Sequence, residues 1–195
     1  MYSDKKIDQF NMLIVGTGGQ GQITLLQILA EAALLEGYDI RTSELHGLSQ
    51  RGGSVEVHLR FGKKIYSPLV CRGKADLILA LEMQEALRGI YFSGQKTKFL
   101  LNKQIIPVSL AKNLTETEIL KNLKKIGKVI LIPAAEICQK ELKTNVVAGI
   151  YLISLASFKN LIPLKPESIL RAIKKIIPEK YLELNLKTFN LAKDY

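Results

Sequence analysis

Short apolar runs at the N-terminal end of the chain alternate with turn residues. Met12–Val15 is an apolar run that leads into the glycine turn GTGGQG. From Gln22 to Leu35 the apolar residues recur at helical spacing, and Gly37 ends that predicted helix. Tyr38–Ser43 follows as a short strand. The order of strand, glycine turn, helix and strand predicts a βαβ unit, which implies a parallel sheet with a right-handed crossover.

The next segment changes to a period of two. Residues Ser54–Phe61 alternate between apolar and polar, which is typical of a half-buried strand. This alternation places His58 on the solvent face of the strand. Gly62 then begins a turn, and the turn predicts a hairpin that returns through Ile65 and Tyr66.

The rest of the chain is predicted to contain short strands and helices. Thr115 and Glu118 have the spacing of a capping box, which predicts a helix that starts at Thr115 and continues to Lys125. Further strands are predicted at Asp76–Ala80, Lys98–Leu101, Ile105–Ser109 and Val129–Ile132. Further helices are predicted at about Met83–Arg88, at Ala134–Leu142, Val146–Ser157 and Glu167–Ile176, and from Pro178 to about Ala192.

This order of elements predicts the fold class and the domain organisation. We expect an α/β fold with a doubly wound, mostly parallel, Rossmann-like sheet and a C-terminal helical segment. The length of 195 residues suits a single domain over 1–195. Within that domain we expect an α/β core over about 1–142 and a helical part over about 145–195.

The charge of the chain adds a question about partners. The net charge is +10, and the excess falls in residues 96–128 and 159–195. Most of the positive residues are lysine, whereas sequence-specific nucleic-acid readers favour arginine, and no aromatic ladder accompanies these lysines. We therefore expect no nucleic-acid partner. The basic residues are predicted to form solvated helix faces or, alternatively, a patch for an acidic partner such as a ferredoxin or a neighbouring subunit.

Candidate metal, redox and targeting features are sparse. Cys71 and Cys138 lie far apart, and with His46 and His58 they give no metal-ligand spacing. The N-terminus lacks an apolar signal core, and no apolar run approaches the roughly 20 residues that span a bilayer. We expect a cytoplasmic protein that binds no metal and no membrane. No serine has the context of a nucleophile elbow.

The glycine turn is the first candidate site. Gly16, Gly18 and Gly21 match GxGxxG between a strand and a helix, where the first glycine permits a tight turn, the second lets a ligand approach and the third lets helix and strand pack. Three interpretations stay open: a site for NAD or FAD, a site for another anion or phosphate, and a purely structural turn. The whole candidate segment is Gly16, Thr17, Gly18, Gly19, Gln20 and Gly21.

The dinucleotide interpretation requires an acid at the end of the second strand. Glu44 has the right spacing, but it leads directly into the crowded polar segment HGLSQRGG, where a dinucleotide enzyme would leave room for adenosine. We therefore expect that the isolated chain binds neither NAD nor FAD tightly.

The segment Glu44–Gly53 is the second candidate site. Loops at the carboxyl ends of parallel strands face one crevice, so this loop is expected to line the same wall as the glycine turn. His46 could carry a proton near neutral pH or simply satisfy loop carbonyls. Arg51 could hold a carboxylate or phosphate, or form an inter-subunit ion pair. The candidate residues of this loop are Ser43, Glu44, His46, Gln50, Arg51, Gly52 and Gly53.

Several stretches together resemble a known family. These are VGTGGQG at Val15–Gly21, the segment Ile28–Gly62 that contains SELHGLSQRGGSV, YSPL at Tyr66–Leu69, ADLILALEMQEALR at Ala75–Arg88, and the closing YLELNLKTFNLA. The chain resembles the gamma-type domain of 2-oxoacid:ferredoxin oxidoreductases, and within it the beta subunit of indolepyruvate oxidoreductases. Gln22 departs from the family pattern, which more often has an apolar residue there.

The resemblance implies a cofactor-free small subunit of a two-subunit enzyme. A large partner would carry thiamine diphosphate, magnesium and iron–sulfur clusters, and the complex would use coenzyme A and pass electrons to ferredoxin. The implied reaction is oxidative decarboxylation of an aryl 2-oxoacid to an acyl-CoA, with no confident catalytic residue on this chain. The alternatives are a gamma subunit for pyruvate, 2-oxoglutarate or branched-chain 2-oxoacids, and a stand-alone Rossmann-type nucleotide-binding protein.

Overall fold

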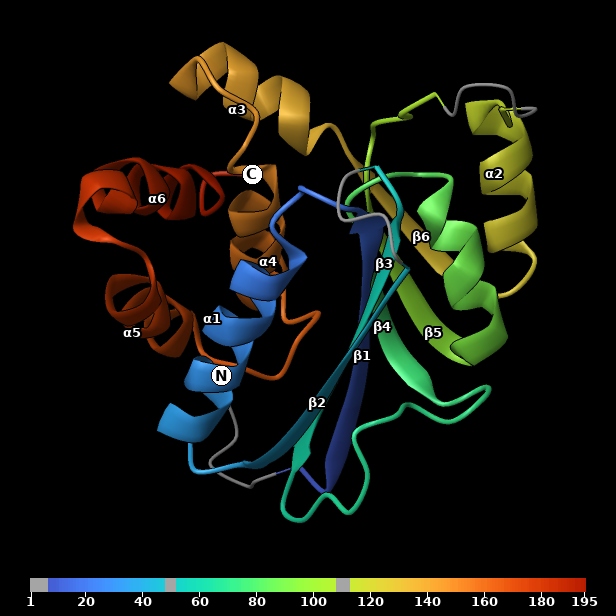
Figure 1. Ribbon diagram of the computed structural model, residues 1–195, viewed down its shortest axis with the longest axis horizontal. Coiled ribbons are helices and arrows are strands. Elements are labelled where there is room, and N and C mark those ends of the chain that lie inside the picture. The colour runs from blue at the N-terminus through green and yellow to red at the C-terminus, as the bar shows by residue number, and fades with distance from the viewer. Residues whose placement is uncertain (1–6, 48–51, 108–112) are drawn as a thin grey trace.

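The computed structural model describes residues 7–47, 52–107 and 113–195, except for the side chain of His46 (Figure 1). Six strands form one sheet in the order β2-β3-β1-β4-β5-β6. Strands β1, β4, β5 and β6 are parallel neighbours, whereas β3 lies antiparallel between β1 and β2. The bounds of the strands are Gln9–Thr17 for β1, Asp39–His46 for β2, Ser54–Gly62 for β3, Ala75–Ala80 for β4, Ser93–Asn102 for β5 and Lys128–Ile132 for β6.

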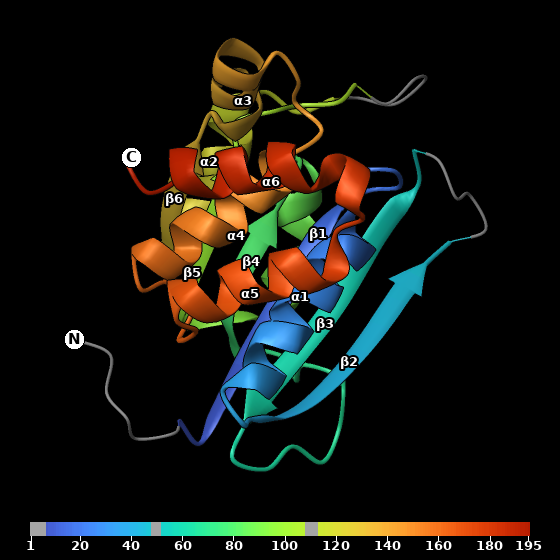
Figure 2. The same ribbon diagram turned by 90° about the vertical axis from the view of Figure 1, so that its left-hand side faces the viewer.

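Helices cover both faces of the sheet, which confirms the predicted mostly parallel α/β architecture (Figures 1 and 2). On one face lie α1 and the C-terminal helices; on the other lie the 3-10 helix η1 and α2. The bounds are Gln22–Leu35 for α1, Glu85–Phe92 for η1, Glu116–Lys124 for α2, Ala134–Leu142 for α3, Ala148–Phe158 for α4, Pro166–Ile176 for α5 and Glu179–Leu191 for α6.

Two apolar cores explain why the layers hold together. The larger core joins one face of the sheet to α1, α4 and α5, and Met12 and Tyr151 are fully buried within it. The smaller core lies under η1 and α2 and contains Ile78 and Phe99. Because the C-terminal helices share the larger core with β1 and α1, we propose that 1–195 folds as one domain rather than as a core with a separate appendage.

Most predicted elements are confirmed, including the helices that became α1 and α3. The capping box is also confirmed: the Thr115 hydroxyl accepts from the Glu118 amide, and the Glu118 carboxylate accepts from the Thr115 amide at 2.9 Å. The predicted helix at about Met83–Arg88 is instead the 3-10 helix η1, which starts two residues later and ends four residues later.

Two strand-pairing predictions were wrong. β2 does not pair with β1, because β3 inserts between them; β2 is therefore the edge strand, although it runs in the same direction as β1 (Figure 2). The predicted hairpin partner at Ile65 and Tyr66 is not a strand, since both edges of β3 are already occupied by β1 and β2. The predicted strand Ile105–Ser109 is absent over 105–107, and its last two residues lie outside the described part.

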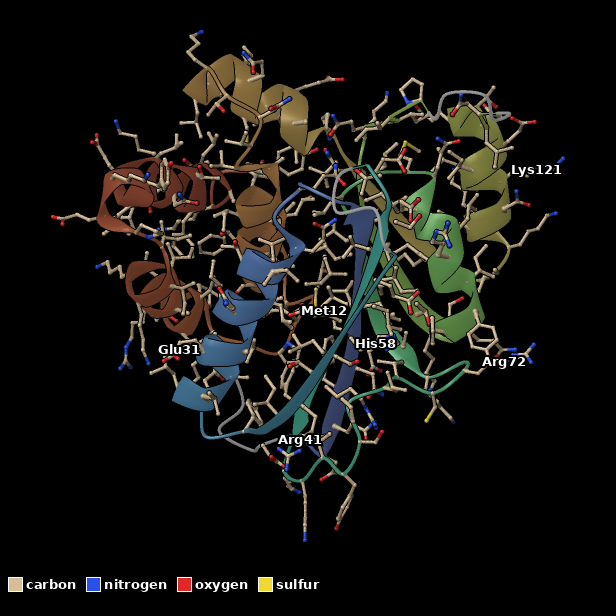
Figure 3. The ribbon with its side chains drawn as sticks, viewed as in Figure 1. Met12, Glu31, Arg41, His58, Arg72 and Lys121 are labelled. Carbon is tan, nitrogen blue, oxygen red and sulfur yellow. The ribbon has the colours of Figure 1, made fainter. Side chains whose placement is uncertain are left out.

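His58 was wrongly predicted on a solvent face. Its side chain is 1% exposed, because the loop after β3 and η1 cover that side of the sheet. Figure 3 labels His58 beside the sheet. The Val70 amide donates to its Nδ1 at 3.1 Å, its Nε2 lies 2.9 Å from the Glu56 carboxylate, and Phe92 packs edge-on against its ring. His58 is thus a structural residue that fixes the loop over the smaller core.

Candidate functional site

Backbone conformation explains why two positions of the turn are glycine. Gly19 and Gly21 have φ angles of 101° and 81°, which L side chains rarely adopt. A Cβ at either position would meet nothing within 4 Å. The expectation that Gly21 is needed for close packing of helix and strand was therefore wrong: the left-handed backbone at the N-cap of α1 is what requires glycine there.

The first glycine makes room for the protein's own side chains. The Thr17 amide donates to Gln20 Oε1 at 2.8 Å, and Gln22 Nε2 donates to the Thr17 carbonyl at 2.8 Å. A Cβ at Gly16 would lie 2.7 Å from both of these glutamine atoms. Gln22, the departure from the family pattern, is only 3% exposed and is part of this packing. The space beside Gly16 is therefore filled by amides of the chain itself.

Within the described part of the second candidate loop, two backbone hydrogen bonds join it to the glycine turn. The Gly18 amide donates to the Gly53 carbonyl at 2.7 Å, and the Gly52 amide donates to the Gly18 carbonyl at 3.3 Å. The expectation that turn and loop share one edge of the sheet holds for these three glycines. It holds because β1 and β2 run in the same direction and end at the same edge, although they are not neighbours.

The loop begins later than the sequence indicated. β2 continues through His46, so Ser43 and Glu44 are strand residues, half-buried and exposed respectively. Gln50 and Arg51 lie outside the described residues, as does the side chain of His46. The described residues therefore bring together the glycine turn and the end of the loop, Gly52 and Gly53.

A carboxylate that the sequence analysis missed lies where the loop meets β3. The Ser54 hydroxyl donates to Glu85 Oε1 at 2.8 Å, and the other oxygen of Glu85 lies 2.9 Å from Arg88 Nε. These contacts connect the start of β3 to η1. Glu85 could not be assigned from sequence because its role depends on the antiparallel insertion of β3.

A small polar pocket opens beside the glycine turn, at the carboxyl edge of the sheet. It has a volume of about 250 Å³, and it is called the polar pocket below. Asn102 is 2% exposed and anchors its wall: the side-chain Nδ2 donates to the Leu81 carbonyl at 3.2 Å, and Oδ1 accepts from the Ala135 amide at 3.1 Å. The lining is Gly19, Gln20, Gly21, Leu81, Asn102, Gln104, Ile106, Asn145, Val146, Ala148 and Gly149.

Sequence reasoning missed Asn102, Gln104 and Asn145. A signal existed for Asn102, because it ends an apolar strand and polar residues at the carboxyl ends of parallel strands often face a ligand. Gln104 and Asn145 had no such signal, since their place follows from how the chain continues after β5 and before α4.

A larger apolar pocket continues from the polar one, with a volume of about 500 Å³. It lies between the start of α1, the start of α4 and α6, and it is called the apolar pocket below. The two pockets have Gln20, Gly21, Val146 and Gly149 in common, so they form one cleft. The remaining residues of the apolar pocket are Thr24, Leu25, Val147, Ile150, Ile177, Pro178, Tyr181, Leu184 and Asn185.

A buried carboxylate supports the segment that carries the polar pocket. Glu82 is 1% exposed and accepts hydrogen bonds from the amides of Glu85 at 2.8 Å and Ile106 at 3.1 Å. Burial raises the pKa of the Glu82 carboxyl above its usual 4.5. Glu82 therefore joins the N-terminus of η1 to the chain after β5.

This raised pKa gives a pH prediction. Because the folded pKa of Glu82 exceeds the unfolded one, its contribution to stability is full below about pH 4.5 and is lost as the pH rises through the folded pKa. We expect Glu82→Gln to flatten the dependence of the unfolding free energy on pH between about pH 4.5 and the raised pKa of Glu82 in the folded protein. It should also cost about 1–3 kcal/mol, since a glutamine NH2 would face a backbone N–H. Urea unfolding between pH 4 and 8 measures both; an unchanged pH slope would contradict the prediction.

Comparison with known proteins identifies the family. A model of the pyruvate ferredoxin/flavodoxin oxidoreductase family matches residues 11–195. The chain belongs to this family. The match includes the glycine turn, the loop that bonds to it and both pockets, so the whole described site lies within the shared region.

Relatives within the family agree with this assignment. The chain is 40% identical over 192 residues to the indolepyruvate oxidoreductase subunit IorB of Archaeoglobus fulgidus, covering 94% of this chain and 93% of the relative. It is 36% identical over 190 residues to the IorB subunit of Thermococcus kodakarensis, with 94% of each covered. The pyruvate/ketoisovalerate oxidoreductases common subunit gamma of Pyrococcus abyssi is 29% identical over 180 residues, covering 88% and 89%.

Solved structures share the fold. Pyruvate oxidoreductase subunit PORC of Thermotoga maritima matches with a TM-score of 0.70 at 20% identity, covering 96% of both chains. A 2-oxoglutarate:ferredoxin oxidoreductase of Magnetococcus marinus, with 2-oxoglutarate, coenzyme A and succinyl-CoA bound, matches with a TM-score of 0.69 at 17% identity. This chain covers only 32% of that longer polypeptide, where the same fold is one part of a larger protein.

The cofactors that this family implies can be tested against the side chains present. An iron–sulfur cluster is held by several cysteine thiolates. The chain has two cysteines: Cys71 is exposed, and Cys138 is buried, which raises the pKa of its thiol to about 11. Among the described residues, no group of His, Cys, Asp and Glu could hold a metal ion, and no helix could cross a membrane. The donor set of this chain thus does not fit a cluster.

Proposed function

We propose that this chain is the small subunit of an indolepyruvate (aryl 2-oxoacid):ferredoxin oxidoreductase. The observation that carries the proposal is the pairing of GTGGQG with SELHGLSQRGGSV, which meet at one edge of the sheet through the Gly18–Gly53 hydrogen bond. Relatives that match along nearly their whole length are named as subunits of indolepyruvate oxidoreductase. The reaction is oxidative decarboxylation of an aryl 2-oxoacid to an acyl-CoA, with electrons passing to ferredoxin.

The chemistry belongs to a large partner subunit in this proposal. That partner carries thiamine diphosphate, magnesium and the iron–sulfur clusters. This chain contributes what we call the glycine edge, which consists of the turn Gly16–Gly21 and the segment Glu44–Gly53, the end of β2 and the loop after it. Loops at the carboxyl ends of parallel strands are where α/β proteins meet their ligands. The loop is polar and glycine-rich, which suits contact with a second protein better than packing within the chain. The complex is expected in the cytoplasm.

A related enzyme with another substrate is the second candidate within the same family. The observation that favours it is the 29% identity to gamma subunits that pyruvate and ketoisovalerate oxidoreductases share. Co-expression of the chain with its large partner, followed by ferredoxin-linked turnover of indolepyruvate, phenylpyruvate, pyruvate, 2-oxoglutarate and 2-oxoisovalerate, separates the two. A preference for the aryl acids supports the proposal; a preference for the aliphatic ones rejects the aryl assignment.

A stand-alone nucleotide-binding protein is the candidate from a different class. We expect the isolated chain to have no oxidoreductase activity and to bind NAD, NADP and FAD no more tightly than millimolar, because Gln20 and Gln22 fill the space beside Gly16. Titration calorimetry with the three cofactors is the measurement. Micromolar binding of any of them would favour the nucleotide-binding alternative.

A further inference from the structure

The loop between β3 and β4 lies at the end of the sheet opposite the glycine edge. It consists of residues 63–74 and is called the amino-edge loop below. Gly62 at the end of β3 pairs with Gln9 at the start of β1, so this loop leaves the sheet where the parallel strands begin (Figure 1). The loop contains YSPL, one of the stretches that resemble the family. Contact at the glycine edge gives that stretch no role.

Side chains of the sheet hold the backbone of the amino-edge loop in place. Arg60 Nη1 donates to the Ser67 carbonyl at 2.7 Å and to the Leu69 carbonyl at 3.1 Å. The amides of Ile65 and Val70 donate to side chains of β2 and β3, at 2.8 Å and 3.1 Å respectively. The loop thus has a fixed backbone, and a partner that binds it loses little entropy in ordering it.

This fixed backbone presents large side chains to solvent. Tyr66 is 83% exposed and Leu69 is 47% exposed. Lys64 Nζ lies 5.1 Å from the centroid of the Tyr66 ring. Beside the loop, Tyr91 at the end of η1 is 60% exposed, and the Arg72 guanidinium lies 5.3 Å from its ring centroid. Tyrosine and arginine are enriched at protein interfaces and among the residues that carry most of the binding energy.

The charges of the amino-edge loop define the kind of partner that fits it. The loop carries Lys63, Lys64, Arg72 and Lys74 and no acidic residue. Lys63 forms an ion pair with Asp8 at 2.6 Å. The other three have no acidic partner among the described residues, and Arg72 points away from the sheet (Figure 3). A second copy of this chain, with a net charge of +10, would be repelled here, whereas an acidic surface would be attracted.

We propose that the amino-edge loop is a second docking surface for the large partner subunit. Tyr66 and Leu69 insert into an apolar depression of that subunit, and carboxylates around the depression face Lys64, Arg72 and Lys74. The inference rests on the proposed function and adds to it: the large subunit contacts this chain at both ends of the sheet. In the Magnetococcus marinus protein the same fold is likewise one part of a longer polypeptide.

Ferredoxin is the other acidic candidate for this surface. Electron-transfer contacts are weak and bury less than about 1,200 Å², whereas permanent interfaces are larger and more apolar. Two exposed apolar side chains on a fixed backbone therefore favour the permanent partner. A carrier docked here would also meet a chain whose donor set does not fit a cluster.

The experiment follows the dissociation of the co-expressed complex as it is diluted. A double variant, Tyr66→Ser with Leu69→Ser, removes the apolar contacts and keeps the loop carbonyls that Arg60 holds. We expect the concentration at which half of the ferredoxin-linked turnover is lost to rise more than about tenfold. Arg72→Glu should raise it about fivefold at low salt and less at high salt, because salt screens the lost attraction.

Lys193→Glu is the matched control for Arg72→Glu. It makes the same change of charge at an exposed position beside the C-terminus, which both ribbon views place away from the amino-edge loop (Figures 1 and 2). It should dissociate at the wild-type concentration. Arg72→Glu also tests the proposal by itself if the double variant fails to fold.

The outcomes separate the possible occupants. If the double variant and Arg72→Glu dissociate as Lys193→Glu does, the loop is not a docking surface and the proposal is overturned. A raised KM for ferredoxin with unchanged dissociation also overturns it and assigns the loop to ferredoxin. A wild-type complex that turns over no 2-oxoacid refutes the proposed function instead, and gel filtration at the same dilutions then tests the docking surface separately.

Discussion

Gly16→Val is expected to destabilise the chain by about 3–5 kcal/mol. The first atom of the new side chain would lie 2.7 Å from Gln20 Oε1 and Gln22 Nε2 and 3.2 Å from Leu81 Cβ. The two glutamines can move, but they then give up their hydrogen bonds to the Thr17 amide and carbonyl. The extra methyl groups must also fit within the buried end of β1, so overpacking adds to the lost bonds. Urea unfolding of the isolated chain measures the effect.

A mutant cycle identifies the cause of that loss. In a background with Gln20→Ala and Gln22→Ala, the two nearest obstacles beside Gly16 are gone and only Leu81 Cβ stays close, so adding Gly16→Val should cost much less than in the wild type. If Gly16→Val costs the same in both backgrounds, the two glutamines are not the reason why position 16 requires glycine. If Gly16→Val keeps the wild-type stability of the chain but the complex loses turnover, an external group approaches Gly16 instead.

The helices could be predicted from sequence more fully than the strand pairing. α1 and α2 carry local signals: helical spacing that ends near Gly37, and the Thr115 capping box. The pairing of β3 is not local, since its contacts with β1 join residues from 37 positions apart, Thr17 and Ser54, to 53 positions apart, Gln9 and Gly62. The polar face of β3 also looks solvent-exposed in sequence. His58 is buried there only because the later segments around Val70 and Phe92 fold over it.

The candidate site also divides into parts that local sequence signals predict and parts that depend on contacts between distant segments. The glycine turn and the loop could be found from sequence because their residue types are unusual at those places. The Gly18–Gly53 bond follows from the rule that parallel strands end at one edge. The cleft could not be found, because its walls come from α1, α4 and α6, whose approach is set by packing: a Cβ at Gly149 would lie 2.8 Å from Leu25. Asn185 shows the same limit, because only its neighbours in space place it on the wall of a pocket.

Arg51→Ala is expected to weaken assembly with the large subunit or to lower ferredoxin-linked turnover by more than about tenfold. Arg51 belongs to the loop whose end, Gly52 and Gly53, bonds to the glycine turn. We expect its guanidinium to pair with an acidic group of the large subunit near the thiamine site, with His46 and Gln50 hydrogen-bonding nearby. Truncating one member of a buried interfacial charge pair costs roughly 2–5 kcal/mol. His46→Ala should act in the same direction but less strongly.

Arg41→Ala provides the control for this prediction. Arg41 lies on β2, the strand that leads into the loop. Its side chain is 50% exposed and forms an ion pair with Asp39 at 2.7 Å. An exposed pair of this kind contributes about 0–1 kcal/mol, so its loss should leave assembly and turnover near the wild-type values. Co-purification with the large subunit, turnover of the purified complexes and the circular dichroism of each isolated subunit are the measurements. If Arg51→Ala and His46→Ala assemble and turn over as Arg41→Ala does, the partner does not bind at the Glu44–Gly53 loop, and the interface must be sought elsewhere on the chain.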